Sequence, residues 1–492
     1  MKKTPANSNT EKNITLFVVV AMSFLATLDA SIVNIALPVM SESLNVPLSS
    51  IEWVVASYVM IICSTLLFFG RLGDIFGKSR VFSYGTLLFI IGTLLCGVCN
   101  SFVPLIVCRF IEGIGASAYM ANNQGIITEL YPQEGRSRAL GILAATVALG
   151  TMTGAPLGGF IVSLLSWNYI FYVNVPIGIA IFGFGLKYLP KDKKNPDQHI
   201  DKAGSVLQFF GTMLLFGSLM EAQKAGFSSP YILDSILLAV VIFVLFIGLE
   251  MRCQQPLLDL SLFRNQLFPI SLICALISFI CITANTFLFP FYLEDTLKIS
   301  PSASGLLMMI SPIVIALLSP SCGTLADKIR PEILTMAGLS VMAVNFFLMS
   351  FLNIRSTVVT CAILLSIMAV GQSFFQPANN SLIMSACPKN KLGIGGSVNS
   401  LVRNLGLYLG IVLSTTFLYT FMSSKLGITV TDYVKGRDDV FVYGMENDYR
   451  ILTLLCIIGA LITVFRFTKT RKHSGETIIR KKIRTNNRKS GN

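Results

Sequence analysis

The chain is 492 residues long and has the composition of a membrane protein. Hydrophobic residues make up 53% of it and charged residues only 13%, and the mean hydropathy is +0.70. Soluble domains carry about 25% charged residues, so this composition excludes a soluble globular protein. Basic loops and a basic tail account for the net charge of +13, and no nucleic-acid partner is needed to explain it.

Long apolar runs recur along the whole chain and predict transmembrane α-helices. In hydrocarbon only helices and closed barrels satisfy their backbone groups, and continuous runs of about 20 apolar residues fit helices rather than alternating strands. The fourteen runs cover residues 14–37, 50–70, 80–100, 103–127, 138–162, 167–189, 203–221, 231–251, 268–291, 302–324, 332–352, 357–386, 396–421 and 448–468. The predicted fold class is an all-α polytopic membrane protein with 14 transmembrane helices.

The distribution of Lys and Arg predicts the orientation of these helices. The loops after the even-numbered runs hold most of the basic loop residues, which places them in the cytoplasm. Nine more basic residues follow position 468. An even number of spans therefore predicts a cell-membrane protein with both termini in the cytoplasm. The longest outer loop is expected at 422–447, where acidic residues gather.

Asp29 is a carboxylate inside the first run, which is otherwise uncharged. An acid at bilayer depth costs roughly 2.5 to 3.5 kcal/mol on insertion scales, so we expect Asp29 to face water, a partner or a ligand. It is the first candidate functional residue. The alternative is an acid that is satisfied by polar groups of neighbouring helices and has no role beyond packing.

Arg109 and Glu112 lie in the fourth run at a depth similar to that of Asp29. At 1.5 Å per residue, Asp29 is roughly 22 Å from the cytoplasmic surface of a bilayer about 30 Å thick. Arg109 and Glu112 are roughly 9 Å and 13 Å from its outer surface. One polar cluster is expected, in which a carboxylate takes up and releases a proton as its surroundings change. In the alternative, Arg109 and Glu112 pair permanently and only hold their helix in place.

The junction between the second and third runs combines glycines, an acid and basic residues. Two glycines allow a tight turn, and Asp74 can accept hydrogen bonds or a charge from a neighbouring helix end. The residues of this predicted conformational switch are Gly70, Asp74, Gly77, Lys78 and Arg80. The pattern resembles the signature between helices 2 and 3 of the major facilitator superfamily. A weaker copy of this glycine, acid and basic-residue pattern surrounds Asp327, between the tenth and eleventh runs.

Three further stretches resemble the fourteen-helix drug:proton antiporters of that superfamily. Residues 28–38 (LDASIVNIALP) are similar to the first-helix motif, and residues 109–115 (RFIEGIG) to the helix 4 motif, whose arginine is associated with proton coupling. Residues 150–159 are similar to the antiporter motif, except that Ala155 separates glycine from proline. The expected motif residues are Gly150, Gly154, Pro156, Gly158 and Gly159. Small residues and proline are also ordinary features of membrane helix packing.

The resemblance implies a major facilitator fold with helices grouped 6+2+6. The expected segments are a cytoplasmic N-terminus (1–13), an N-terminal six-helix half (14–189), a cytoplasmic linker (190–202), two extra spans (203–251), a second cytoplasmic linker (252–267), a C-terminal six-helix half (268–468) and a basic cytoplasmic tail (469–492).

The resemblance also implies a function. The chain is expected to be a secondary active transporter that exports lipophilic or cationic drugs and other toxic small molecules in exchange for protons, and so to confer antibiotic resistance. Asp29, Arg109 and Glu112 are then expected to couple protons or meet the substrate. One alternative is a proton-coupled exporter or importer of a single metabolite. A membrane-embedded enzyme or receptor is disfavoured, because the runs contain no metal-ligand cluster and no nucleophile with a histidine partner.

Polar residues inside the runs are candidates to line a central cavity, or simply to bond neighbouring helices. They are Asn34, Gln372, Gln376, Asn379, Arg403 and Asn404. The expected partners are a small-molecule substrate, protons and the lipid bilayer. We expect a monomer without a cofactor, without a metal and without enzymatic activity.

Overall fold

The structure is a computed structural model in which every regular element of the described residues is helical. It describes residues 9–46, 48–51, 53–131, 135–190, 200–225, 229–428, 434 and 436–489. Fourteen helical segments in these ranges are long and apolar enough to cross a membrane. The predicted all-α fold class with 14 transmembrane helices is confirmed.

The N-half is the bundle of helices that precedes residue 190. Its helices are α1 (Asn9–Leu44), α2 (Leu48–Ile51), α3 (Trp53–Phe76), α4 (Lys78–Val98), α5 (Phe102–Leu130), α6 (Arg136–Leu164), α7 (Tyr169–Tyr172) and α8 (Asn174–Tyr188). The break between α3 and α4 is a single residue, Gly77, whose φ of 106° favours glycine. The turn expected in this junction is therefore confined to Gly77, since Gly70 and Gly73 continue the helix of α3.

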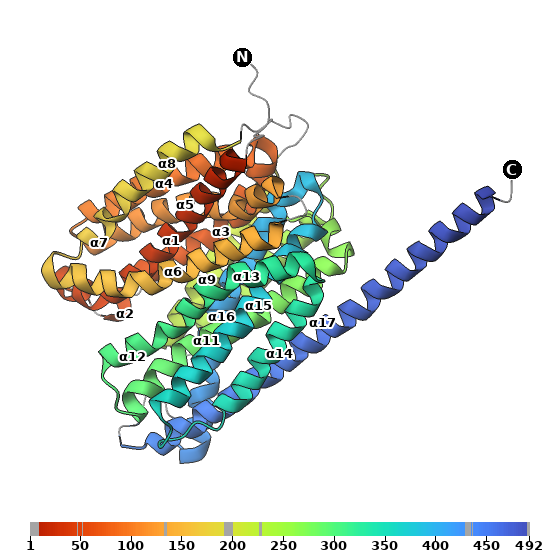
Figure 1. Cartoon of the computed structure of the whole chain (residues 1–492). Coiled ribbons are helices and arrows are strands. Elements are labelled where there is room, and N and C mark those ends of the chain that lie inside the picture. Colours follow the sequence, from red (N-terminus) through yellow and green to blue (C-terminus); the bar gives the residue numbers. More distant parts are fainter. Residues whose placement is uncertain are drawn as a thin grey trace.

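The C-half is the bundle that begins at residue 267. Its elements are α11 (Leu267–Phe291), the π-helix η2 (Tyr292–Thr296), α12 (Pro301–Met308), α13 (Ile310–Lys328), α14 (Pro331–Met349), α15 (Val358–Ala386), η3 (Lys389–Lys391), α16 (Leu392–Leu426) and α17 (Asp438–Lys489). Figure 1 shows the two halves side by side, the N-half in red to yellow and the C-half in green to blue.

Between the halves run α9 (Lys202–Ala225) and α10 (Pro230–Glu250), followed by the short helix η1 (Leu260–Arg264). The amide Nε2 of Gln208 on α9 donates to the carbonyl of Cys63 on α3. Further along α9, the ring of Phe216 lies 4.7 Å from the ring of Tyr408 on α16. The first of the two extra helices thus contacts both halves.

The last span begins earlier than the sequence predicts. The outer loop was expected at 422–447, whereas α16 extends to Leu426 and α17 begins at Asp438. Val440, Phe441 and Met445 are buried in the core of the C-half, and removal of their apolar surface from water stabilises a helix there despite the acidic residues around them. Residues 191–199 of the predicted linker, like residues 1–8 and 490–492, lie outside the described ranges.

One end of the bundle holds the junctions between α3 and α4, α5 and α6, α13 and α14, and α15 and α16. We call it the basic end, since Lys78, Arg136, Arg330 and Lys391 lie at these junctions. The halves meet closely near this end: a Cβ added to Gly323 would lie 2.3 Å from the carbonyl oxygen of Ser137. Such backbone contact requires glycine and holds the two halves together on this side.

Candidate functional site

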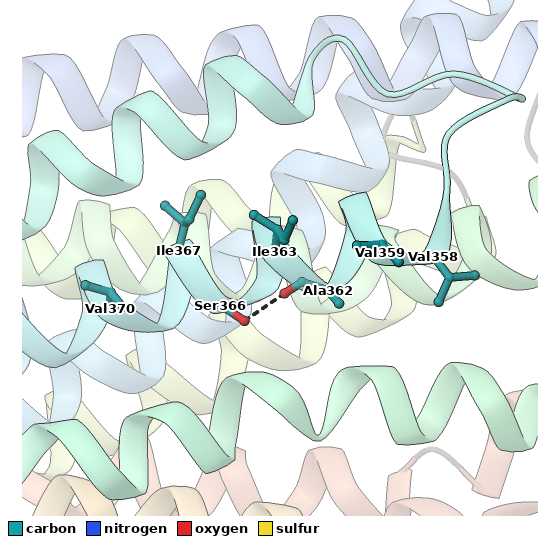
Figure 2. Close-up of a pocket in the computed structure, with 7 residues that line it drawn as sticks. All are labelled: Val358, Val359, Ala362, Ile363, Ser366, Ile367 and Val370. Carbon is teal, nitrogen blue, oxygen red and sulfur yellow. Dashed lines mark hydrogen bonds between the residues drawn. The ribbon is translucent and has the colours of Figure 1, made fainter.

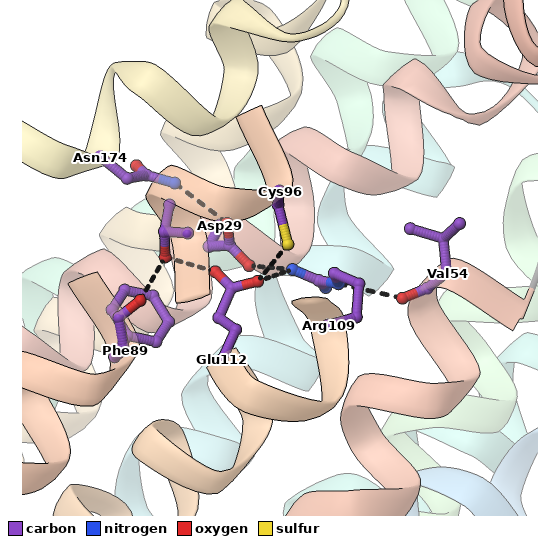
Figure 3. A network of polar contacts seen from close by, with 8 residues as sticks. Asp29, Val54, Phe89, Cys96, Arg109, Glu112 and Asn174 are labelled. Atoms are coloured by element: carbon purple, nitrogen blue, oxygen red, sulfur yellow. Dashed lines mark hydrogen bonds and ion pairs between the residues drawn. The ribbon is translucent and has the colours of Figure 1, made fainter. Parts of the chain in front are cut away.

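Five helices of the N-half, α1, α3, α4, α5 and α8, supply a buried cluster of charged side chains and its partners. Asp29 comes from α1, Arg109 and Glu112 from α5, and all three are fully buried. Figure 3 shows the two carboxylates next to each other, with the guanidinium of Arg109 in contact with both. Its Nη1 lies 3.0 Å from Oδ2 of Asp29 and 2.6 Å from Oε2 of Glu112. The structure therefore brings the three predicted residues into direct contact.

The remaining contacts of Arg109 fix the guanidinium in one position. Its Nε donates to the carbonyl of Val54 on α3 at 3.0 Å, and its Cζ lies 4.3 Å from the centre of the Tyr58 ring. Charge-assisted hydrogen bonds and a cation–π contact both strengthen when water is excluded. Its Nη2 is buried without a hydrogen-bond partner. The cation is therefore held by two helices and keeps one unused donor.

Each carboxylate also has a neutral partner, on α8 or on α4. The amide Nδ2 of Asn174, the first residue of α8, donates to Oδ1 of Asp29 at 3.0 Å. The hydroxyl of Thr93 on α4 lies 2.6 Å from Oε1 of Glu112 and 2.8 Å from the carbonyl of Phe89. Figure 3 includes both contacts. These groups orient the acids and leave them out of contact with water.

The predicted glycine motif positions the helix that carries Asp29. Added Cβ atoms at Gly150 and Gly154 would lie 2.1 Å from Oγ1 of Thr27 and 2.3 Å from Cβ of Ser31 on α1, and a Cβ at Gly158 would lie 3.1 Å from the carbonyl of Ile32. Close approach of this kind is the usual role of small residues between membrane helices. Gly159 has nothing within 4 Å, and Pro156 lies inside α6.

Asp74 links the two halves at the basic end. Its carboxylate accepts hydrogen bonds from the backbone N–H groups of Gly393 at 2.8 Å and Ile394 at 2.9 Å, in the first turn of α16. A helix N-terminus attracts a negative charge, because its first N–H groups lack helical partners. Lys78 lies 3.2 Å from Asp74 and 2.7 Å from Glu129. Arg80, also assigned to this switch, is exposed.

A second carboxylate makes the reciprocal contact. Asp327, at the end of α13 in the C-half, accepts hydrogen bonds from the backbone N–H groups of Ser137 at 3.0 Å and Arg138 at 3.1 Å. These residues form the first turn of α6 in the N-half. Each half therefore caps a helix of the other half with an acid, and both contacts close the basic end.

Only two of the six predicted cavity residues line the central cavity. It holds about 30 Å³ and lies between α1, α5 and α6 of the N-half and α16 of the C-half, with Arg403 and Asn404 in its wall. Asn379 instead donates to the carbonyl of Ser271 within the C-half. The other three, which do not line this cavity either, are the exposed Asn34, the buried Gln372 and the half-buried Gln376.

A larger groove of about 420 Å³ runs along α15 and is apolar. Its lining residues are Val358, Val359, Ala362, Ile363, Ser366, Ile367 and Val370, shown in Figure 2. The hydroxyl of Ser366 donates to the carbonyl of Ala362 on its own helix, so it is already satisfied. This groove offers apolar contact alone.

Several residues of the site carry too weak a signal to be found from sequence. Thr93 and Tyr58 are single polar residues in apolar runs, and such residues bond their own helix as often as a neighbour. A stronger signal was overlooked in the fourth run, where Asn122, Asn123 and Gln124 are consecutive. Three amides in a row at bilayer depth indicate a polar surface, and Asn123 and Gln124 do line the central cavity.

Fold and site together define a membrane transporter built from two helical halves. The sequence profile of the Major Facilitator Superfamily matches residues 19–411. The chain belongs to the major facilitator superfamily, in agreement with the predicted resemblance and its fourteen-helix layout.

Individual relatives differ in their named cargo. The riboflavin transporter RibZ of Clostridioides difficile is 34% identical over 94% of this chain and 99% of its own length. The multidrug resistance protein Stp of Mycobacterium tuberculosis is 28% identical over 82% of this chain and 75% of its own length. The solved structure of the proton:xylose symporter XylE has a TM-score of 0.64 at 14% identity, covers 92% of this chain and 95% of its own, and shows the fold alone.

Proposed function

We propose that this transporter is driven by protons, and that Asp29, Arg109 and Glu112 form its proton-binding site. The observation that carries the proposal is the sharing of one buried guanidinium by two buried carboxylates. With both acids ionised the cluster has a net charge of −1, and a net charge is costly in a region without water. One added proton makes the cluster neutral. A site that is balanced by one proton is suited to exchange one proton.

Hydrogen-bond geometry supports a position for that proton. The Thr93 hydroxyl has a single hydrogen and lies between two acceptors, the carbonyl of Phe89 and Oε1 of Glu112. Both contacts are satisfied when Thr93 donates to Phe89 and a protonated Glu112 donates to Thr93. Arg109 then pairs with the ionised Asp29. Release follows when a movement of α1 or α5 separates the acids or admits water.

We call the contacts of Asp74 with the first turn of α16 and of Asp327 with the first turn of α6 the two gates. Proton binding can drive a conformational cycle if it changes how readily these gates open. From the positive-inside rule we expect the basic end and both termini to lie in the cytoplasm, with the protein in the cell membrane. The contacts of Asp74 and Asp327 then keep the cytoplasmic side closed in this conformation. Both must break for the halves to open inward. Protonation alters the packing of α1 and α5 inside one half and so changes the balance between the two states.

Export of a small molecule is the direction that the multidrug-named relatives favour, and its exchange for protons is part of our proposal. Relatives named as multidrug resistance proteins support the predicted efflux of drugs and a role in antibiotic resistance. Transport of one metabolite is the second candidate, and the 34% identity to the riboflavin transporter over nearly its whole length favours it. In either case we expect the monomer to be the functional unit, since each monomer contains a complete cluster and both gates.

Transport by proteoliposomes under an imposed pH gradient tests the proposal. The wild-type chain should accelerate movement of riboflavin or ethidium against the proton flow. Asp29→Asn and Glu112→Gln should each reduce gradient-driven transport by about tenfold or more, the equivalent of about 1.4 kcal/mol. Asp448→Asn is the matched control, because Asp448 is equally buried and forms no ion pair among the described residues. Full gradient-driven activity in both cluster variants would refute proton coupling at this site.

A further inference from the structure

The central cavity has a wall rich in hydrogen-bonding groups. It lies where the halves meet, and α1, α5, α6 and α16 supply its lining. The lining residues are Ser23, Ala26, Thr27, Tyr119, Met120, Asn123, Gln124, Leu143, Val147, Ser400, Arg403 and Asn404. Eight of these twelve residues carry a polar side-chain group, in contrast with the apolar groove on α15. Such a wall at bilayer depth marks a binding surface for a polar molecule.

Amide side chains of the two halves meet beside this cavity. The amide Nδ2 of Asn399 on α16 lies 2.8 Å from Oε1 of Gln124 on α5 and 3.0 Å from Oδ1 of Asn380 on α15. The Oδ1 of Asn399 and the hydroxyl of Tyr119 are buried without a partner. An unsatisfied buried polar atom costs about 1–3 kcal/mol, so both atoms gain if a ligand supplies the missing partner.

Arg403 supplies the one full charge in the wall. Its side chain lines the cavity, and no described acidic residue forms a salt bridge with it. No lining residue is an acid. The buried acids of the N-half, Asp29 and Glu112, are already paired with Arg109. A cationic ligand would therefore meet an uncompensated positive charge, whereas a carbonyl or carboxylate oxygen would meet a free guanidinium.

We propose that the cargo is a neutral or anionic heteroaromatic molecule of the flavin type, with carbonyl oxygens for Arg403 and an amide-like edge for the side chains of Gln124 and Asn399. Asparagine and glutamine side chains offer a donor and an acceptor together, which matches the imide edge of such a ring. The aromatic ring of Tyr119 adds a surface for ring contact. This assignment rests on the proposed transport function and differs from the lipophilic or cationic drugs expected from the sequence.

The size of the cavity sets a condition on binding. Drug-sized ligands occupy pockets of about 300–1,000 Å³, far more than the 30 Å³ present here. The lining residues are therefore the floor of a site that is complete when the halves separate away from the basic end. Binding should consequently favour the state in which Asp74 and Asp327 keep the basic end closed.

Equilibrium binding to the purified full-length protein in nanodiscs tests the cargo class. Quenching of flavin fluorescence should show saturable binding of riboflavin, which is neutral, and of flavin mononucleotide, which is anionic. Tetraphenylphosphonium should not compete. Arg403→Gln should weaken flavin binding by about tenfold or more, and Arg403→Lys should weaken it less, because lysine keeps the charge but not the planar fork. Arg450→Gln is the control, since Arg450 is exposed and does not line this cavity.

Each outcome decides the proposal. Absence of binding of both flavins to a folded protein, or tight binding of tetraphenylphosphonium that Arg403→Gln leaves unchanged, would overturn it. Unaltered flavin affinity in Arg403→Gln, with the protein folded by circular dichroism, would also overturn it. Flavin binding without pH-driven flavin transport would leave the cargo class in place and reject the proton coupling instead, so the two failures are distinguishable.

Discussion

The region of the C-half that corresponds to the charged cluster of the N-half holds an uncharged hydrogen-bonded pair, Tyr449 and Asn285. The first, third and sixth helices of each half contribute side chains at these two places. In the N-half they bring together Asp29, Arg109 and Glu112. In the C-half the hydroxyl of Tyr449 on α17 donates to Oδ1 of Asn285 on α11 at 3.2 Å, and the Tyr449 ring stacks on Phe346 of α14 at 6.0 Å.

The C-half joins its helices at this position with an uncharged pair, so buried charges are not required for the fold. Both places are buried, and a hydrogen-bonded neutral pair is sufficient to join the helices of the C-half. Packing therefore does not require the three charges of the N-half, whose ionisable groups are expensive to bury. The C-half keeps one buried acid, Asp448, without an ion pair among the described residues, whereas the N-half holds two acids on one arginine. The proposed proton exchange requires such a shared cation, and packing alone does not.

The largest effect is expected from removal of the shared cation. Arg109→Gln leaves two buried carboxylates without a charge partner, which should destabilise the protein by about 3–5 kcal/mol. The measurement is the thermal unfolding midpoint in detergent. The triple variant Asp29→Asn, Arg109→Gln and Glu112→Gln carries no charge at this place, like the C-half. It should regain most of the lost stability but not the pH-driven transport. An Arg109→Gln protein as stable as wild type would contradict the comparison.

An intermediate effect is expected at the gates, where the halves exchange similar contacts. Asp74→Asn removes a charge from the first turn of α16 and leaves Lys78 with Glu129 alone. A loss of about 1–2 kcal/mol should open the basic end about five- to thirtyfold more often. Asp327→Asn should do the same to a smaller extent, since no described lysine pairs with Asp327.

The readout for both gate variants is the labelling rate of Ser400→Cys by a maleimide added from the basic end, in a background without other cysteines. Ser400 lines the central cavity, so its labelling reports opening on that side. Faster labelling in Asp74→Asn than in Asp327→Asn is the expected order. Rates equal to those of the parent in both variants would show that the two carboxylates do not hold the gate.

The smallest effect is expected in the neutral pair. Tyr449→Phe deletes the hydroxyl that donates to Asn285 and keeps the stacked ring. Loss of one neutral hydrogen bond should lower the free energy of unfolding by about 0.5–1 kcal/mol and leave pH-driven transport unchanged. Thermal unfolding in detergent measures the stability of this variant, and the proteoliposome assay measures its pH-driven transport. A large transport defect in Tyr449→Phe would mean that the C-half also takes part in coupling.

The sequence predicts the charged cluster better than its surroundings, and the reason is physical. A charged side chain is costly in a bilayer, so it needs a partner at a similar depth. The positions of Asp29, Arg109 and Glu112 along their helices predict similar depths, and this is why the three could be grouped. Neutral polar residues such as Thr93 and Asn174 carry no comparable cost and leave no comparable signal. Helix rotation decides whether they meet an acid, and it depends on tertiary packing.

Contacts between the halves were harder still to predict. The pairing of Gln124 with Asn399 joins residues 275 positions apart and depends on the conformation of the transporter. The sequence predicts that the last span begins only at Asp448, because acidic residues interrupt the apolar residues before it. In the structure Asp448 is buried in α17, where Ser414 donates to it at 2.5 Å. Burial of Val440 and Phe441 in the C-half core decided that outcome.

Infrared difference spectroscopy tests the central claim, that the cluster of the N-half exchanges a proton, most directly. Spectra of the purified protein at acidic and alkaline pH would be compared in the region of the carboxylic-acid carbonyl stretch. The band should grow on acidification in wild type and in Asp448→Asn, and be lost from the difference spectrum of Glu112→Gln combined with Asp29→Asn. An unchanged band in that double variant would place the exchanged proton elsewhere and contradict the account.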